Sequence, residues 1–124
     1  MDLEDVEAHL INVFPDFSID ECALGLPYCV AGNFALYLLN AYTNNSIDTL
    51  LLAGKFIETL YTYNDDKIEE LATIGYLEAI QNVWANNDVD PEIIFNHLGI
   101  TSQKWWVELN KFWNGEEYSD LTSP

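Results

Sequence analysis

The amino-acid sequence predicts an all-α protein, a compact single domain of five or six antiparallel-packed helices. Apolar residues recur at steps of three and four along most of the chain, which is typical of amphipathic helices. No stretch of four or more residues shows strand-like alternation framed by hairpin signals. Short polar breaks with helix-start and helix-stop residues separate the periodic segments. At 124 residues, the chain has the length of one domain.

The first two helices are predicted from the N-terminal part of the chain. An apolar stripe from Leu3 to Val13 predicts a helix at residues 3–13. Pro27 suits the first position of a helix, where its missing N–H is not needed. The helix that it opens, at residues 27–43, is apolar nearly all round, so we expect it to be the central, buried one.

The later helices are indicated mainly by their caps. Ser46 is a suitable N-cap, and Asp65 and Asp66 suit the positive N-terminus of a helix. Asp90 followed by Pro91 is a strong start signal, because a capping residue precedes proline at the first helical position. Thr101 or Ser102 is expected to cap the last helix. We expect the four helices at residues 46–63, 66–86, 91–98 and 102–114.

The same stripes predict the core and the extent of the domain. The residues expected in the core are Leu10, Phe34, Leu38, Leu50, Ile57, Leu71, Trp105, Leu109 and Phe112. Aromatic side chains on the last helix could also stack on sugars, but their spacing matches a core stripe. Residues 1–115 are expected to form the single helical domain, and residues 116–124 a polar C-terminal tail.

The most unusual property of the chain is its charge. Twenty-one acids face four lysines, there is no arginine, and the formal net charge is −17. Such a field repels its own parts, yet 49% hydrophobic and 14% aromatic residues indicate a folding chain rather than a disordered acidic tail. A strongly basic partner explains the surplus, whereas nucleic acid and anionic membranes are disfavoured as direct ligands.

The sequence favours a cytoplasmic protein with reduced thiols. No run approaches 18 apolar residues, and the N-terminal residues 1–5 are acidic where a signal peptide is basic. A disulfide between Cys22 and Cys29 is then not expected. We expect both cysteines to be small core residues.

No motif of catalysis or of cofactor binding is evident. There is no P-loop, no dinucleotide fingerprint and no H-E-x-x-H. The acidic run at residues 88–92 lacks the glycine of a calcium loop, and two cysteines with His9 and His97 have no zinc-ligand spacing. Carboxylate pairs are too frequent for one to stand out as an acid–base dyad. We therefore expect no cofactor, no metal, no small-molecule substrate and no enzymatic activity.

Clusters of acids are the feature most relevant to function. Asp66 and Glu70 repeat the same charge at helical spacing, as do Asp65 and Glu69, and such pairs cost a few tenths of a kcal/mol each. Either these acids form a solvated face or they bind a partner. The candidate partner-binding residues are Asp65, Asp66, Glu69, Glu70, Glu78, Gln81 and Asn82. The next candidates are Asp16, Asp20 and Glu21, in the loop before the helix at residues 27–43.

Two stretches in the C-terminal half carry a resemblance to a known group of proteins. They are residues 73–82, TIGYLEAIQN, and residues 97–113, HLGITSQKWWVELNKFW. Together they resemble the small acidic helical immunity proteins of bacterial contact-dependent-inhibition and polymorphic-toxin systems. The resemblance implies a cytosolic inhibitor that binds one cognate toxin. It assigns no site residues, because no family site pattern is matched.

Three functions are consistent with these observations. The first is an immunity protein that neutralises a basic toxin, most readily a nuclease and particularly an RNase, by stoichiometric occlusion. The second is a nucleic-acid mimic that blocks a DNA-binding enzyme. The third is a small enzyme with an acidic pocket for a cationic substrate such as a polyamine. A deep cleft with converging carboxylates would favour the third, and a convex acidic face would count against it.

Overall fold

The structure is a computed structural model that describes residues 2–113, and within them it is all-α, without strands. The α-helices are α1 (Leu3–Val13), α2 (Pro27–Thr43), α3 (Ile47–Leu60), α4 (Asp66–Glu70), α5 (Glu78–Asn86) and α6 (Ile100–Trp113). Three 3-10 segments, η1 (Glu21–Ala23), η2 (Tyr61–Tyr63) and η4 (Pro91–His97), and the π-helix η3 (Leu71–Leu77) complete the order. The predicted fold class is confirmed, whereas the predicted tail at residues 116–124 lies outside the described residues.

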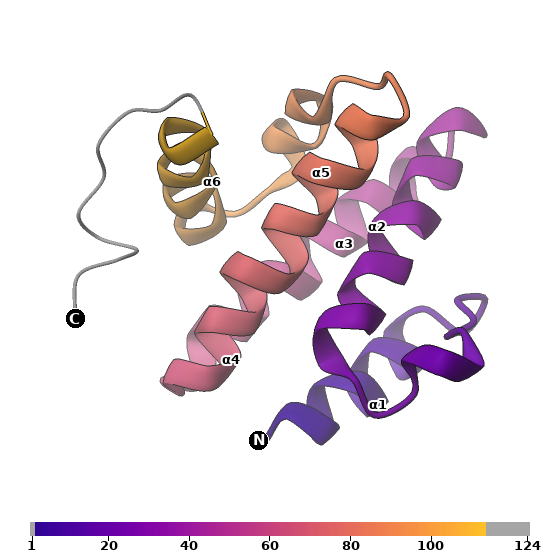
Figure 1. The fold of residues 1–124 in the computed structure, drawn as a ribbon, viewed down its shortest axis with the longest axis vertical. Helices are drawn as coiled ribbons and strands as arrows, with labels where there is room; N and C mark the ends of the chain where they lie inside the picture. Colours follow the sequence, from indigo (N-terminus) through magenta and orange to yellow (C-terminus); the bar gives the residue numbers. More distant parts are fainter. Residues whose placement is uncertain (1, 114–124) are drawn as a thin grey trace.

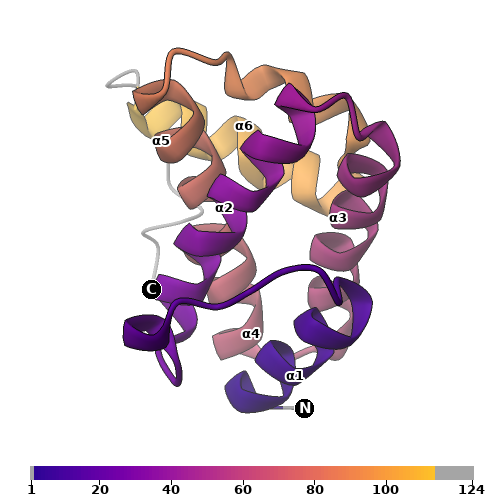
Figure 2. The ribbon, with the colours of Figure 1, turned by 90° about the vertical axis from the view of Figure 1, so that its right-hand side faces the viewer.

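The central helix α2 packs between α3 on one side and the continuous run α4–η3–α5 on the other. Helix α1 lies at one end of this arrangement, near α4, and η4 crosses the opposite end between α5 and α3 (Figure 1; Figure 2). Helix α6 then packs against η3 and α3. The role predicted for the helix at residues 27–43 is thus confirmed.

The caps explain why the predicted starts were accurate. The Asp2 carboxylate accepts a hydrogen bond from the Asp5 backbone N–H, and the Asp5 carboxylate accepts one from the Asp2 backbone N–H, so a capping box opens α1. Pro27 stands at the start of α2. Asp65 caps α4 by accepting hydrogen bonds from the backbone N–H groups of Lys67 and Ile68 at 2.9 and 3.1 Å.

The predicted single helix at residues 66–86 is corrected in one respect, because its middle is the π-helix η3. A π-turn holds more residues than an α-turn, so the buried face moves along the sequence. An uninterrupted α-helix would continue the apolar stripe from Gly75 to Ala79 and Val83. The fully buried positions are instead Tyr76, Leu77, Ile80, Gln81 and Trp84.

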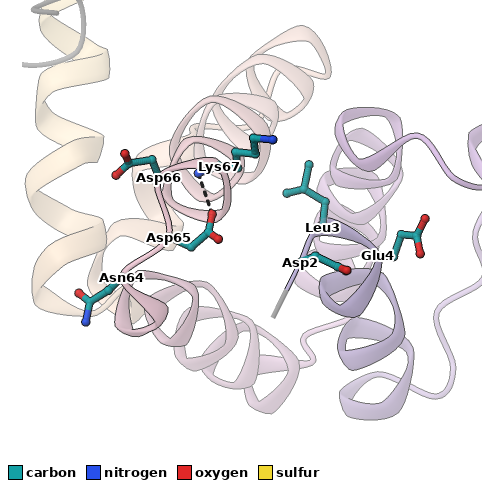
Figure 3. A pocket seen from close by; sticks show the side chains of 7 residues that line it. All are labelled: Asp2, Leu3, Glu4, Asn64, Asp65, Asp66 and Lys67. Carbon is teal, nitrogen blue, oxygen red and sulfur yellow. Dashed lines mark hydrogen bonds between the residues drawn. The ribbon is translucent and has the colours of Figure 1, made fainter.

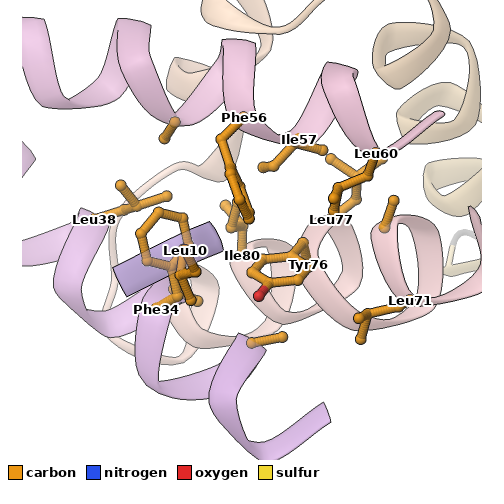
Figure 4. Packing of buried hydrophobic residues seen from close by; sticks show 14 of the residues in the cluster. Leu10, Phe34, Leu38, Phe56, Ile57, Leu60, Leu71, Tyr76, Leu77 and Ile80 are labelled. Atoms are coloured by element: carbon orange, nitrogen blue, oxygen red, sulfur yellow. The ribbon is translucent and has the colours of Figure 1, made fainter. Parts of the chain in front are cut away.

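Aromatic rings of α2, α3 and η3 and of Phe14, the residue that follows α1, meet in the core, and Figure 4 shows Phe34, Phe56 and Tyr76 among them. Phe34 of α2 packs edge-on against Phe14 with ring centroids 4.9 Å apart and against Tyr76 at 5.8 Å. Phe56 of α3 contacts Tyr76 at 5.7 Å, and edge-to-face pairs of this kind stabilise beyond their buried area. Leu10, also predicted in the core, is fully buried among them.

Helix α6 begins where α3 comes closest to the chain that leads into it. A Cβ atom on Gly54 would collide with the backbone carbonyl of His97, and one on Gly99 would collide with the Glu58 side chain. Glycine at both positions therefore permits the contact. The helix starts at Ile100, and the Glu58 carboxylate of α3 caps it, in place of the predicted caps Thr101 or Ser102.

The buried stripe of α6 is shifted from the predicted one. Trp106 and Leu109 are buried, whereas Trp105 is only partly buried and Phe112 is 47% exposed, so the prediction is wrong for Phe112. Trp106 can be buried because its indole N–H donates to Glu92 of η4 at 2.8 Å. Seven of the nine core predictions are confirmed, since Leu10, Phe34, Leu38, Leu50, Ile57, Leu71 and Leu109 are all 1% exposed or less, and Trp105 packs against the core only in part.

Candidate functional site

A cleft of about 690 Å³ separates the N-terminal ends of α1 and α4. Its lining consists of Asp2, Leu3, Glu4, Asn64, Asp65, Asp66 and Lys67. The side chain of Leu3 reaches from α1 toward α4, whereas the carboxylates of Glu4 and Asp66 point outward in opposite directions (Figure 3). The cleft is therefore acidic at its rims, and its carboxylates do not converge on one point.

The four carboxylates of this cleft differ in how far the fold already uses them. Asp2 and Asp65 hold the backbone N–H groups of their own helices. Glu4 and Asp66 are exposed and make no hydrogen bond or ion pair within residues 2–113. They are consequently the two carboxylates of the cleft that are free to meet an incoming cation.

The acids of α4 differ in their contacts. Glu70 is exposed and accepts a hydrogen bond of 3.3 Å from the Tyr28 hydroxyl of α2. Glu69 is partly buried near Tyr61; burial first, and then the charges of Glu58 and Glu69, raise the pKa of the Tyr61 hydroxyl. Asp66 and Glu70 are four residues apart on α4, so the repulsion between like charges expected from the sequence applies to this pair.

The prediction that Glu78, Gln81 and Asn82 form an exposed polar side is wrong for Gln81. Gln81 is 5% exposed, Glu78 is partly buried, and Asn82 is exposed. Burial raises the pKa of the Glu78 carboxyl above its ordinary value. The cause of the error is the π-helix η3, which rotates the following residues relative to a continuous α-helix.

Gln81 belongs to a polar network that joins α5, η4 and α6. Its amide Nε2 donates to the Asn110 side-chain oxygen at 3.2 Å and more weakly to the Trp106 carbonyl at 3.4 Å. Asn110 and the Trp106 indole in turn both donate to the Glu92 carboxylate, at 3.0 and 2.8 Å. Glu92, which the sequence places among the surface acids, thus fixes α6 to η4.

The second candidate surface, the loop before η1, is exposed as predicted. Asp16, Asp20 and Glu21 are all exposed. The Asp20 backbone N–H donates to the side-chain oxygen of Asn33 at 3.1 Å, which attaches the loop to α2. Burial first, and then the charge of Asp16, raise the pKa of the Tyr37 hydroxyl. These acids therefore lie along the outer side of α2.

Lysines do little to compensate the acidic surface. Within residues 2–113, the one ion pair joins Lys111 to Glu108 at 3.6 Å. The Lys104 ammonium lies 5.3 Å from the centre of the Trp105 ring instead of on a carboxylate. Exposed carboxylates such as Asp16, Glu21 and Asp66 thus form no ion pair with a lysine among the described residues.

The prediction that Cys22 and Cys29 are core residues is wrong. Both are free and exposed. They precede the buried stripe of α2, which begins at Val30. Among the described residues, no group of three or more histidine, cysteine, aspartate or glutamate side chains is placed to hold a metal ion.

An exposed apolar surface at residues 24–28 was not predicted from the sequence. Leu24, Leu26 and Tyr28 are 57%, 51% and 43% exposed. Burial first, and then the charge and hydrogen bond of Glu70, raise the pKa of the Tyr28 hydroxyl. The only signal in the sequence was the run of large apolar residues around Gly25 in a segment predicted to be irregular.

Comparison with known proteins places the chain in a family without assigning a function. None of the helices within residues 2–113 is long and apolar enough to cross a membrane. No curated protein and no solved structure matches the chain. One family model matches residues 7–114, which is most of the chain, so the protein belongs to the family described as Domain of unknown function (DUF7674).

Proposed function

We propose that this protein is an immunity protein that binds a basic toxin, most readily a nuclease and particularly an RNase, and neutralises it by stoichiometric occlusion in the cytoplasm. The observation that carries the proposal is the uncompensated acidic surface, where one ion pair is formed among residues 2–113. A folded domain that keeps so much like charge gains from it when the partner is basic.

The chemistry of a nuclease fits this surface. A protein that binds phosphates must present lysine and arginine, so its cleft is basic. Exposed carboxylates such as Glu4 and Asp66 can meet those side chains without first breaking contacts of their own. Long-range attraction then raises the association rate, up to about 10⁸–10⁹ M⁻¹s⁻¹ at low salt, which suits an inhibitor of a lethal protein.

The geometry of the acidic cleft supports a protein partner over a small cationic substrate. Glu4 and Asp66 point away from each other, so the cleft offers no converging set of carboxylates for a polyamine (Figure 3). A nucleic-acid mimic would use the same charges, and the two functions differ in the protein that is inhibited. The neighbouring gene therefore decides between them.

The test uses the protein encoded immediately upstream as the probe. We expect it to bind this chain, to cleave RNA or DNA when alone, and to lose that activity at a 1:1 ratio. Absence of binding at micromolar concentration and low salt would remove the proposal. Inhibition of a host DNA-binding enzyme instead would establish the mimic.

A charge variant makes the test residue-specific. Glu4→Gln, Asp16→Asn, Glu21→Gln and Asp66→Asn together remove exposed charges that make no hydrogen bond or ion pair among the described residues. We expect the association rate to fall about tenfold or more and its salt dependence to flatten. The control is Asp48→Asn with Asp88→Asn, at the start of α3 and in the turn after α5, at the other end of the molecule (Figure 1), and it is compared with the pair Glu4→Gln and Asp66→Asn, which also removes two charges.

A further inference from the structure

The segment that leads into α2 exposes three large apolar side chains in five residues. Leu24 is 57% exposed, Leu26 51% and Tyr28 43%. Single exposed apolar residues are common on soluble proteins, but a contiguous group with a polar rim is typical of an interaction site. We refer to residues 24–28 as the apolar segment.

The fold holds the apolar segment in one conformation. Leu26 N–H donates to the Ala23 carbonyl at 2.9 Å, and Gly25 between them has a φ of +76°, which glycine adopts without strain. Ala23 is buried and anchors η1, while Val30 N–H continues the pattern by donating to the Leu26 carbonyl at 3.0 Å. A loop that is already ordered loses less conformational entropy when it binds.

Tyr28 links the apolar segment to Glu70 of α4. Its hydroxyl donates to Glu70 of α4, 42 residues away in sequence, while Asp20 and Glu21 precede the apolar segment in the chain. The apolar segment therefore has Glu70 at its Tyr28 end and Glu21 three residues before Leu24.

We propose that the apolar segment is the central contact for a basic protein partner, one that presents apolar side chains framed by lysine or arginine. This inference rests on the proposed function and names its contact surface. Buried apolar and aromatic anchors surrounded by charge dominate the energy of many interfaces, and the charges act mainly on rate and specificity. The acidic cleft then guides the approach, and the apolar segment slows dissociation.

Charge complementarity selects this occupant over two others. A second copy of the chain would bring another formal charge of −17 against the same carboxylates. An anionic membrane would be repelled by Glu21 and Glu70 at the edge of the segment. A basic protein gains from both the apolar centre and the acidic rim.

The first experiment uses Leu24→Ser with Leu26→Ser and the upstream-encoded protein as the probe. Both leucines are more than half exposed, so folding should persist. We expect the dissociation rate to rise at least tenfold, while the association rate changes little. The control, Leu51→Ser with Leu52→Ser on α3, removes two other exposed leucines, at 43% and 40%, and should leave both rates unchanged.

A second experiment judges the surface without the toxin. Amide chemical shifts of the unmodified protein are followed with a synthetic helical peptide that carries a leucine stripe between lysines. A peptide of equal charge with serine in place of leucine is the control. We expect stronger binding of the leucine peptide and shifts centred on residues 22–30 and 69–75.

The outcomes separate the two proposals. Equal binding of both peptides, or shifts centred on Asp2, Glu4 and Asp66, would overturn the apolar contact, because charge alone would then account for binding. An upstream protein that binds normally to the Leu24→Ser, Leu26→Ser variant would overturn it as well, while leaving the immunity function intact. An upstream protein that does not bind at all would remove the immunity function, and the peptides would still judge the surface.

Discussion

Helix α6 is held at its start by a carboxylate from another helix, and this contact predicts a specific pH dependence. Glu58 accepts hydrogen bonds from the backbone N–H groups of Thr101 and Ser102 at 3.2 and 2.9 Å and from the Ser102 hydroxyl at 2.8 Å. Burial acts to raise the pKa of Glu58, but the hydrogen bonds from Ser102 and Thr101 outweigh it and hold the pKa below its ordinary value.

We expect Glu58→Gln to destabilise the protein by about 1 kcal/mol at pH 7. The amide keeps one acceptor oxygen but loses the charge, and a hydrogen bond to a charged group is worth about twice a neutral one. Glu58→Ala removes all three hydrogen bonds and leaves the N-terminal N–H groups of α6 without their cap. Loss of a cap costs about 0.5–2 kcal/mol, so with the further hydroxyl bond we expect about 2–3 kcal/mol.

The sign of the pH effect follows from the lowered pKa. The ionised carboxylate contributes its stability above the unfolded pKa of about 4.3, and the contribution is lost as pH falls through the lower folded pKa. Urea unfolding of the protein and of Glu58→Gln between pH 7 and pH 3 should therefore show a free-energy difference that shrinks below about pH 4. Asp16→Asn, an exposed carboxylate, serves as the control. A difference that does not vary with pH would refute this account of Glu58.

Three further predictions concern packing, burial and the thiols. Gly54→Ala should destabilise by at least about 1–3 kcal/mol because its Cβ meets a backbone carbonyl, whereas Gly32→Ala in α2, where the space is open, should stabilise by about 0.5–1 kcal/mol; urea unfolding measures both. Glu78→Gln should stabilise at pH 7 by up to about 0.5 kcal/mol, a gain that disappears as pH falls, because burial raises this pKa. Cys22 and Cys29 should both react with a thiol reagent in the native protein, and reductant should leave Tm unchanged; slow reaction limited by unfolding would contradict their exposure.

Sequence periodicity and caps predicted the beginning of the fold well and its second half less well. The helices at residues 3–13 and 27–43 have the predicted bounds, because Asp2 and Pro27 act locally and their effect can be read from neighbouring residues. The cap of α6 could not be predicted in this way, since Glu58 lies 42 residues before Ile100. A tertiary contact thus replaced the expected local one.

The errors at the candidate site have one main physical cause. Over two turns, the apolar pattern does not distinguish an α-helix from the π-helix η3, yet the difference moves Gln81 from the surface to the core. On α6, Trp106 is buried in place of the predicted Trp105, and its hydrogen bond to Glu92 of η4 satisfies the buried indole N–H. The hydrogen bond between Tyr28 and Glu70 joins the start of α2 to α4, a contact between residues 42 positions apart that the sequence does not indicate.

The structure divides the acids into two groups, and the division determines how function should be tested. Asp2 and Asp65 cap helices, Glu58 and Glu92 hold α6, and their replacement would alter folding together with charge. Exposed acids such as Asp66 make no such contacts within residues 2–113. Loss of binding after changing the first group could reflect misfolding, whereas loss after changing the second can be attributed to the missing charge. Glu70 belongs to neither group cleanly, because its replacement removes the Tyr28 hydrogen bond as well as the charge.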